Sequence, residues 1–183
     1  MRIVGGQFKG RQVPLKAEFA RPTSDKVREA LFSILYDRIE DARCLDLFTG
    51  SGCIGLEALS RGAAHVVFAD RDRRAIAALR ENLERFGVEK DRFTALTGSY
   101  EAVAKELADQ GERFDFIYLD PPYDAGYYES ALTWADRLVK DTGIVVAEHR
   151  HGMVLPERVG DLVRFRERKY GTQVIALYTK EDA

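Results

Sequence analysis

Short apolar runs alternate with stretches of helical periodicity through most of this chain, and this alternation restricts the fold more than any other feature. The run 114–119 is an example: it does not alternate between apolar and polar residues, as expected of a strand that is covered on both faces of a sheet. Such an alternation is typical of a doubly wound parallel sheet. The candidate strands are 44–48, 65–69, 92–96, 114–119 and 144–147, and the candidate helices are 53–61, 72–86, 100–110 and 127–140.

The two ends of the chain break this alternation. The strand-like runs 162–169 and 172–178 follow one another with only Tyr170-Gly171 between them, which predicts an antiparallel hairpin. Residues 1–14, interrupted by Gly5-Gly6, predict a second, small hairpin, and Thr23 or Ser24 is a candidate N-cap for a helix ending near Ile39. We therefore divide the chain into an N-terminal extension, 1–22, and a main domain, 23–183.

Length and composition fit one α/β domain. The 183 residues are 45% hydrophobic and 32% charged, and no apolar run approaches the roughly 20 residues that a membrane helix needs. The N-terminus has no apolar core of the kind a signal peptide requires. Cys44 and Cys53 are expected to be buried thiols in a cytoplasmic protein, and no Cys/His group has the spacing of a metal site.

The charges are unevenly distributed, although the net charge is only −2. Residues 1–21 carry a net charge of +4 and residues 150–170 a net charge of +3, so the rest of the chain is acidic. Two basic ends on an acidic body would suit phosphate binding along a rim. Solvated charges on unrelated surfaces would explain the same pattern.

A glycine-rich loop follows the first candidate strand. Gly50, Gly52 and Gly55 satisfy the G-x-G-x-x-G pattern between a strand and a helix, which predicts a nucleotide-cofactor site. Asp46, just before the glycines, would repel a pyrophosphate but attract the cationic methionine part of S-adenosylmethionine. Asp70, at the end of the second strand, suits ribose hydroxyls in either cofactor class. The loop thus favours S-adenosylmethionine over a nicotinamide dinucleotide.

The fourth candidate strand ends in Asp120-Pro121-Pro122-Tyr123. In open α/β sheets, ligands bind outside the carboxyl ends of the strands, and two prolines stiffen the backbone there. D/N-P-P-Y/F resembles the motif of methyltransferases that act on exocyclic amines of nucleobases. Asp120 and the carbonyl of Pro121 would hold the amine hydrogens and aim the lone pair, and Tyr123 would stack on the base.

Asp120 also bears on the choice of base. An ionised aspartate only accepts hydrogen bonds, and guanine presents two neighbouring donors, N1–H and its 2-amino group. Adenine instead presents an acceptor beside its amino group. The aspartate therefore favours guanine, but methyltransferases acting on adenine or cytosine also carry this motif.

Three further segments, together with 120–123, resemble the RsmD-like bacterial 16S ribosomal RNA (guanine-N2)-methyltransferase family. They are 2–11, 21–35 and 46–63, so the resemblance covers nearly the whole chain. It implies a class I S-adenosylmethionine-dependent methyltransferase fold: a mostly parallel, Rossmann-like sheet that ends in an antiparallel hairpin, with the small N-terminal β-hairpin extension contacting RNA. It also implies a monomer that acts on small-subunit ribosomal RNA within an assembled or nearly assembled subunit.

The resemblance assigns roles to particular residues of this chain. Lys9, Arg11, Arg21 and Thr23 are expected on the substrate side. The catalytic residues are expected to be Asp120, Pro121 and Tyr123. Cofactor binding is expected from Asp46, Phe48, Gly50, Ser51, Gly52 and Asp70. Many proteins of this fold bind the adenine amino group with an acidic residue after the third strand, but Ser99 stands there in this chain, and we assign it that contact.

Other functions fit parts of the same pattern. The first is an amino-methyltransferase acting on adenine or cytosine of DNA or of another RNA. A nicotinamide-dependent oxidoreductase would use the glycine loop but lacks an evident proton donor. A non-catalytic RNA-binding factor could retain the fold without the chemistry.

Overall fold

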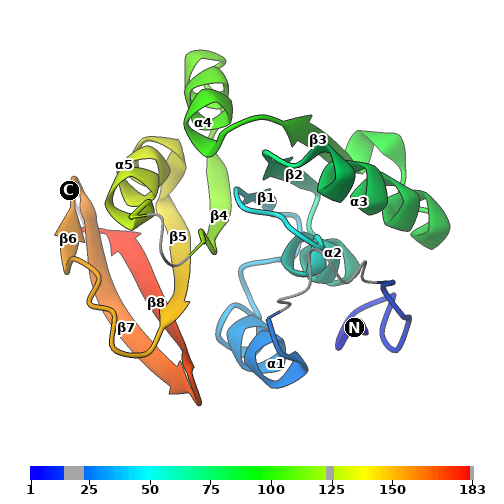
Figure 1. The fold of residues 1–183 in the computed structure, drawn as a ribbon, viewed down its shortest axis with the longest axis horizontal. Helices are drawn as coiled ribbons and strands as arrows, with labels where there is room; N and C mark the ends of the chain where they lie inside the picture. The colour runs from blue at the N-terminus through cyan, green and yellow to red at the C-terminus, as the bar shows by residue number, and fades with distance from the viewer. Residues whose placement is uncertain (15–22, 123–125, 182–183) are drawn as a thin grey trace.

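The computed structural model describes residues 1–14, 23–122 and 126–181. Eight strands form one sheet in the order β3-β2-β1-β4-β5-β8-β7-β6, with helices on both faces (Figure 1). The strands are β1 (Arg43–Asp46), β2 (His65–Asp70), β3 (Phe93–Thr97), β4 (Phe114–Leu119), β5 (Val139–Arg150), β6 (Arg158–Val159), β7 (Leu162–Tyr170) and β8 (Gln173–Lys180). The helices are α1 (Asp25–Ile34), α2 (Cys53–Ser60), α3 (Arg73–Phe86), α4 (Tyr100–Asp109) and α5 (Tyr128–Leu138), with a 3₁₀ turn, η2 (Lys90–Arg92).

The sheet has the predicted mixture of parallel and antiparallel pairing. Strands β1 to β5 pair in parallel with one another, whereas β8 is antiparallel to both β5 and β7. The hairpin turn between β7 and β8 contains Gly171, whose φ of 62° explains the glycine at this position. The predicted fold class and the terminal antiparallel hairpin are therefore confirmed.

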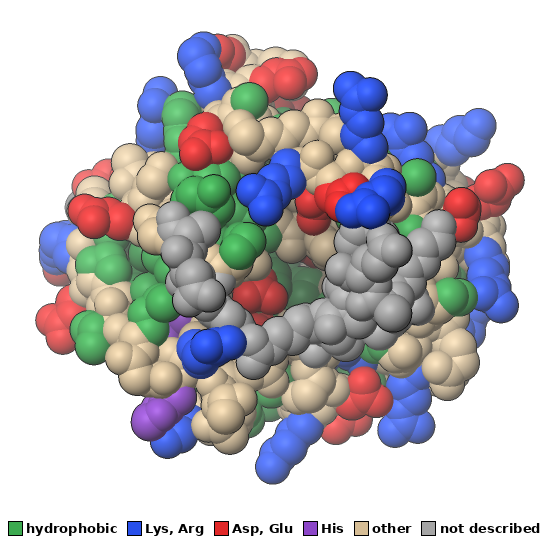
Figure 2. All heavy atoms as spheres, in the orientation of Figure 1, with side chains coloured by type: hydrophobic (Ala, Val, Ile, Leu, Met, Phe, Trp, Pro, Cys, Tyr) green, Lys and Arg blue, Asp and Glu red, His purple; other side chains and the backbone are tan. Residues whose placement is uncertain are grey.

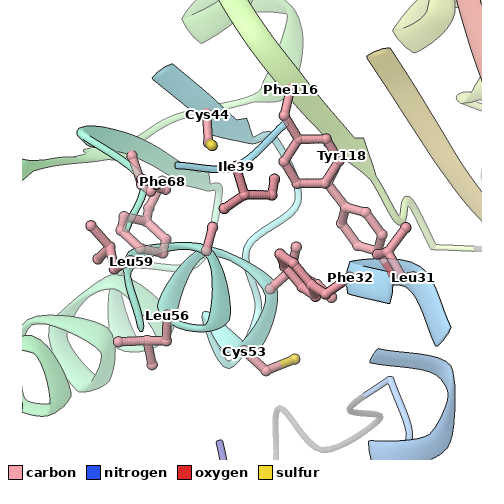
Figure 3. Close-up of a cluster of buried hydrophobic side chains, with 14 of the residues drawn as sticks. Leu31, Phe32, Ile39, Cys44, Cys53, Leu56, Leu59, Phe68, Phe116 and Tyr118 are labelled. Carbon is pink, nitrogen blue, oxygen red and sulfur yellow. The ribbon is translucent and has the colours of Figure 1, made fainter. Parts of the chain in front are cut away.

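The core fills both faces of the sheet. One hydrophobic cluster lies under α1, α2 and α3, where Leu31 and Phe32 of α1 pack toward Phe116 and Tyr118 of β4 (Figure 3). The other cluster lies under α4 and α5. Burial on both faces explains why the strand sequences are apolar throughout rather than alternating. Among the described residues, no helix is long and apolar enough to cross a membrane.

Several boundaries differ from the sequence-based expectation. Helix α1 begins after Ser24, whose hydroxyl accepts from the backbone N–H of Val27, but it ends at Ile34 rather than near Ile39. Strand β5 begins directly at the end of α5, five residues before the expected start, because Val139 already pairs with Phe114. The short strand β6 was not predicted.

The expected N-terminal hairpin is present, but it is shorter and less regular than two full strands. Its two arms pair through one antiparallel bridge, Arg2 with Gln12, and the backbone N–H groups of Ile3 and Val13 donate to the carbonyls of Arg11 and Met1. Glycine-rich turns occupy most of the segment, and Ile3, Phe8 and Val13 are buried in the cluster under α2 and α3. This part of the extension therefore packs into the main core. Residues 15–22 lie outside the described residues.

Candidate functional site

A cavity of about 340 Å³ opens at the carboxyl ends of β1, β2 and β4. Figure 2 shows the hollow in this face of the molecule, with acidic side chains inside it. The parallel strand order brings the glycine loop, the end of β2 and the end of β4 to one edge of the sheet, as expected for a fold of this type. The lining residues are Leu47, Phe48, Gly50, Asp70, Arg71, Gly98, Ser99, Tyr100, Glu101, Asp120, Pro121, Pro122 and Tyr127.

The glycines of the loop are required by conformation and by packing. Gly50 and Gly52 have φ of 50° and 75°, and Gly52 is the N-cap of α2. A Cβ on Gly52 would lie 2.4 Å from Cδ1 of Leu79, and one on Gly55 would lie 2.1 Å from Cε1 of Phe68. Gly50 lines the cavity, whereas Gly52 lets the loop approach α3 and Gly55 lets α2 approach the sheet closely.

Asp46 lies beneath this loop rather than on the cavity wall. It is only 3% exposed, and its carboxylate faces the backbone N–H groups of Gly55 and Phe48. Burial raises its pKa to about 7, and the nearby charge of Asp70 acts in the same direction. The side chain thus organises the loop from below, and its contact with a cofactor stays a prediction.

Asp70 has the position expected of a ribose-binding carboxylate. One oxygen, Oδ2, accepts from the backbone N–H of Gly50 at 2.8 Å, and Oδ1 accepts from that of Asp72 at 2.9 Å. These two bonds fix the carboxylate at the cavity wall. A carboxylate oxygen can accept more than one hydrogen bond, so capacity remains for ligand hydroxyls.

An aromatic wall forms another side of the cavity. The ring centroids of Phe48 and Tyr100 are 5.1 Å apart, and those of Tyr100 and Tyr127 are also 5.1 Å apart. Sequence analysis predicted only Phe48 here, because Tyr100 and Tyr127 lie in segments without a recognisable motif. The wall offers aromatic side chains against which a planar ring can pack.

Ser99 lines the cavity but is already engaged. Its side chain caps α4 by accepting from the backbone N–H of Ala102 at 3.3 Å. Glu101, two residues later, also lines the cavity and is exposed. Sequence analysis found no acidic residue directly after β3, but the first turn of α4 places the carboxylate of Glu101 beside the same cavity. Ser51 and Gly52, by contrast, belong to the loop without lining the cavity.

The D-P-P-Y motif reaches the same cavity from β4. Asp120, Pro121 and Pro122 line it together with Gly50 of the glycine loop. The charge of Asp120 contributes to raising the pKa of Tyr118, after burial and the charge of Glu148, so Asp120 lies close to this part of β4. Tyr123 and Arg21, both predicted site residues, lie outside the described residues.

Beneath Asp120 is a buried polar cluster that sequence analysis did not predict. Thr23, expected on the substrate side, is only 3% exposed, and its Oγ1 donates to Oε2 of Glu148 at 2.8 Å. The hydroxyl of Tyr118 donates to the same oxygen, and Nε2 of Gln173 donates to Oε1. Glu148 thus joins the start of α1 to β4, β5 and β8. No local motif marks Glu148, because its role comes from contacts distant in sequence.

The two basic residues expected to contact RNA differ in their surroundings. Lys9 is exposed, and the structure gives it no ion pair with a described residue. The Arg11 guanidinium donates to the carbonyl oxygens of Arg85 at 2.7 Å and Phe86 at 3.2 Å, and it lies 4.2 Å from the ring centroid of Phe86. Arg11 therefore caps the C-terminus of α3, in addition to any contact with RNA.

Both cysteines are buried and free, as expected. Burial raises the pKa of the Cys53 thiol to about 11 and raises that of Cys44 further. These thiols are protonated at neutral pH and therefore weak nucleophiles.

The strand order, the glycine loop beside β1 and the acidic residue at the end of β2 together define a class I methyltransferase fold. A sequence profile of the family described as "Conserved hypothetical protein 95" matches residues 1–179. The chain belongs to this family, the RsmD family of ribosomal RNA methyltransferases.

Individual relatives agree with the assignment. The chain is 39% identical to the "Putative rRNA methyltransferase YlbH" of Bacillus subtilis, covering 98% of this chain and 99% of that protein. It is 34% identical to the ribosomal RNA small subunit methyltransferase D of Escherichia coli, covering 99% and 90%. A solved structure of a hypothetical protein from Thermus thermophilus superposes with a TM-score of 0.84 at 32% identity, covering 99% of both chains.

Proposed function

We propose that this protein transfers a methyl group from S-adenosylmethionine to the exocyclic N2 amine of a guanine in 16S ribosomal RNA. The observation that carries the proposal is that Asp120, Pro121 and the cofactor-type loop share one cavity. A carboxylate for the amine and a site for the methyl donor are thereby adjacent. The names of the relatives support ribosomal RNA of the small subunit as the substrate.

The residues of the cavity fit the proposed cofactor. Asp70 is held by two backbone N–H groups in an orientation that suits the ribose hydroxyls. The wall of Phe48, Tyr100 and Tyr127 suits the adenine ring, and Glu101 can accept from its amino group. When bound, S-adenosylmethionine supplies an electrophilic methyl group on a sulfonium.

The residues of the D-P-P-Y motif act on the amine. An exocyclic amine is a poor nucleophile because its lone pair is delocalised into the ring. Asp120 and the Pro121 carbonyl accept its two hydrogens, which favours a pyramidal nitrogen whose lone pair points into the cavity. Positioning of this kind and electrostatic stabilisation of the developing positive charge supply much of the rate.

Product analysis tests the proposal. The protein is incubated with labelled S-adenosylmethionine and small subunits that lack the modification, and the RNA is digested to nucleosides. We expect labelled 2-methylguanosine. Label in methyladenine or methylcytosine, or label incorporated into free DNA instead, would establish the alternative amino-methyltransferase. Calorimetry with S-adenosylhomocysteine and NADH addresses the oxidoreductase, which requires tighter binding of NADH.

The substrate context belongs to the same proposal. We propose that the protein is a cytoplasmic monomer that acts on an assembled or nearly assembled subunit. Methylation of assembled subunits and of free 16S RNA should be compared at equal concentration. A faster reaction on free RNA would contradict the expected preference for the subunit.

A further inference from the structure

We propose that the outer strand β7 is a second RNA-binding surface, which holds the phosphate backbone near the target guanine. This inference rests on the proposed function and specifies where the substrate lies on the protein. Three exposed cations, Arg166, Arg168 and Lys169, lie close together on this strand. The structure gives none of them an ion pair with a described residue, so their charges are available to a ligand.

The outer edge of β7 is open along these residues. Strand β6 pairs only with Leu162 and Val163, and the backbone N–H of Arg164 donates to the carbonyl of Glu157. Beyond Arg164, no described strand covers this edge. Phe165 is 49% exposed within the basic run, and an aromatic ring among cations is a common feature of surfaces that bind single-stranded nucleic acid.

Strand direction places the end of β7 at the same edge of the sheet as Asp120. Strand β7 is antiparallel to β8, which is antiparallel to β5, so β7 runs in the same direction as β4 and β5. The backbone N–H of His151, just after β5, donates to the carbonyl of Thr172 in the β7–β8 turn at 2.9 Å. The carboxyl ends of β4, β5 and β7 therefore share one edge.

Register places Arg166 and Arg168 on the face of the sheet that carries Thr23. Arg166 pairs with Leu177 and Arg168 pairs with Ile175, both buried in the cluster under α1. Gln173 lies on this same face of β8, because its side chain reaches the carboxylate of Glu148, which also binds Thr23. Arg166 and Arg168 thus project from the α1 face, whereas Lys169, which pairs with Val174, lies on the opposite face near the end of the strand.

The distance between this surface and the motif suits one RNA strand. Three strand spacings separate β4 from β7, or about 14 Å at about 4.8 Å per spacing. An RNA chain with its target base at Asp120 could place phosphates a few nucleotides away against Arg166 and Arg168. Residues 1–14 lie on the far side of α2 from β7 (Figure 1).

A triple substitution, Arg166→Gln, Arg168→Gln and Lys169→Gln, tests the surface. We expect binding to 16S RNA at low salt to weaken about tenfold or more, because three phosphate contacts are lost. The slope of log K against log salt concentration should fall in magnitude by about 2 to 3. The affinity for S-adenosylhomocysteine and the thermal unfolding midpoint should not change. Arg166→Lys with Arg168→Lys, which keeps both charges, should retain most of the affinity.

A matched control removes three exposed cations from the side of the molecule that carries α4 and α5: Lys105→Gln, Arg113→Gln and Arg137→Gln. The net charge changes equally, so a similar loss of affinity in the control would overturn the inference. If the salt dependence of RNA binding is unchanged in the β7 variant, the inference is also overturned. The charges would then serve only to prevent another strand from pairing with the open edge of β7. Weaker binding to subunits but unchanged binding to free RNA would overturn it in favour of a ribosomal protein contact. Failure of the wild-type protein to methylate any RNA would instead contradict the proposed function.

Discussion

The hydroxyl of Thr23 donates to the carboxylate of Glu148 at 2.8 Å, across 125 positions of sequence, and both residues are buried. This bond attaches the start of α1 to the end of β5, one strand away from Asp120. A buried carboxylate is costly unless hydrogen bonds compensate for its lost hydration. Here Thr23, Tyr118 and Gln173 provide the donors.

The first prediction concerns this bond. Thr23→Val keeps the shape of the side chain but removes a donor to the buried carboxylate, so we expect the free energy of unfolding to fall by about 1–3 kcal/mol. Urea denaturation measures the change. Thr133→Val is the control, because Thr133 is exposed on α5 and should change stability by less than about 0.5 kcal/mol. Equal losses of stability at the two positions would show that the hydrogen bond to Glu148 makes no measurable contribution to the free energy of unfolding.

The second prediction concerns catalysis. Asp120→Ala should lower the methylation rate by at least about 100-fold, because the amine loses its charged acceptor. Affinity for S-adenosylhomocysteine, measured by calorimetry, should stay within about threefold, since Asp70 and the aromatic wall are intact. Asp120→Asn should also be impaired on guanine, because the amide presents a donor where guanine requires an acceptor. Unchanged methylation by Asp120→Ala would remove this residue from the mechanism.

The third prediction separates two basic residues of the N-terminal segment. Arg11→Ala should lower the free energy of unfolding by about 1–2 kcal/mol, because it removes the cap of α3 and the contact with Phe86. Lys9→Ala should change stability by less than about 0.5 kcal/mol and weaken RNA binding instead. Denaturation and RNA-binding measurements on both variants check this difference. A stability loss of similar size in Lys9→Ala would contradict the assignment.

The fourth prediction concerns the pH dependence that Asp46 produces. Its pKa is raised by burial from 3.8 to about 7, so between these values the folded state binds a proton that the unfolded state has lost. The contribution of Asp46 to stability is therefore present below about pH 4 and decreases as the pH rises to about 7, by roughly 2–4 kcal/mol. Above that pH the carboxylate is charged in both states.

Asp46→Asn tests this behaviour, because an amide does not titrate. We compare the free energy of unfolding of the variant with that of the wild type by urea denaturation at about pH 5 and about pH 8. The difference, variant minus wild type, should be more positive at pH 8, because only the wild type loses stability between these values. If Asp46 binds the cofactor as predicted, the variant should also bind S-adenosylmethionine more weakly. A stability difference independent of pH would contradict the raised pKa.

Local sequence patterns determined the architecture of this protein. Apolar runs that are buried on both faces, separated by helical periodicity, specified strands β1 to β4 to within two residues at each end, because burial is encoded in the spacing of the side chains. Gly50 and Asp120 could be placed together because the carboxyl ends of parallel strands meet at one edge, and both line the cavity. The N-terminal hairpin is reduced to one antiparallel bridge, and apolar residues of its turn such as Phe8 pack into the main core.

Contacts between distant segments were decided only by the tertiary structure. Asp46 lies below the loop, Glu148 binds Thr23, and Arg11 caps α3, although none of these contacts is marked by a local motif. Strand order and register bring them together, and both depend on how the whole chain packs rather than on any short motif. The sequence thus determined the fold and the chemical groups of the site, and the packing decided which groups face the cavity and which support it from beneath.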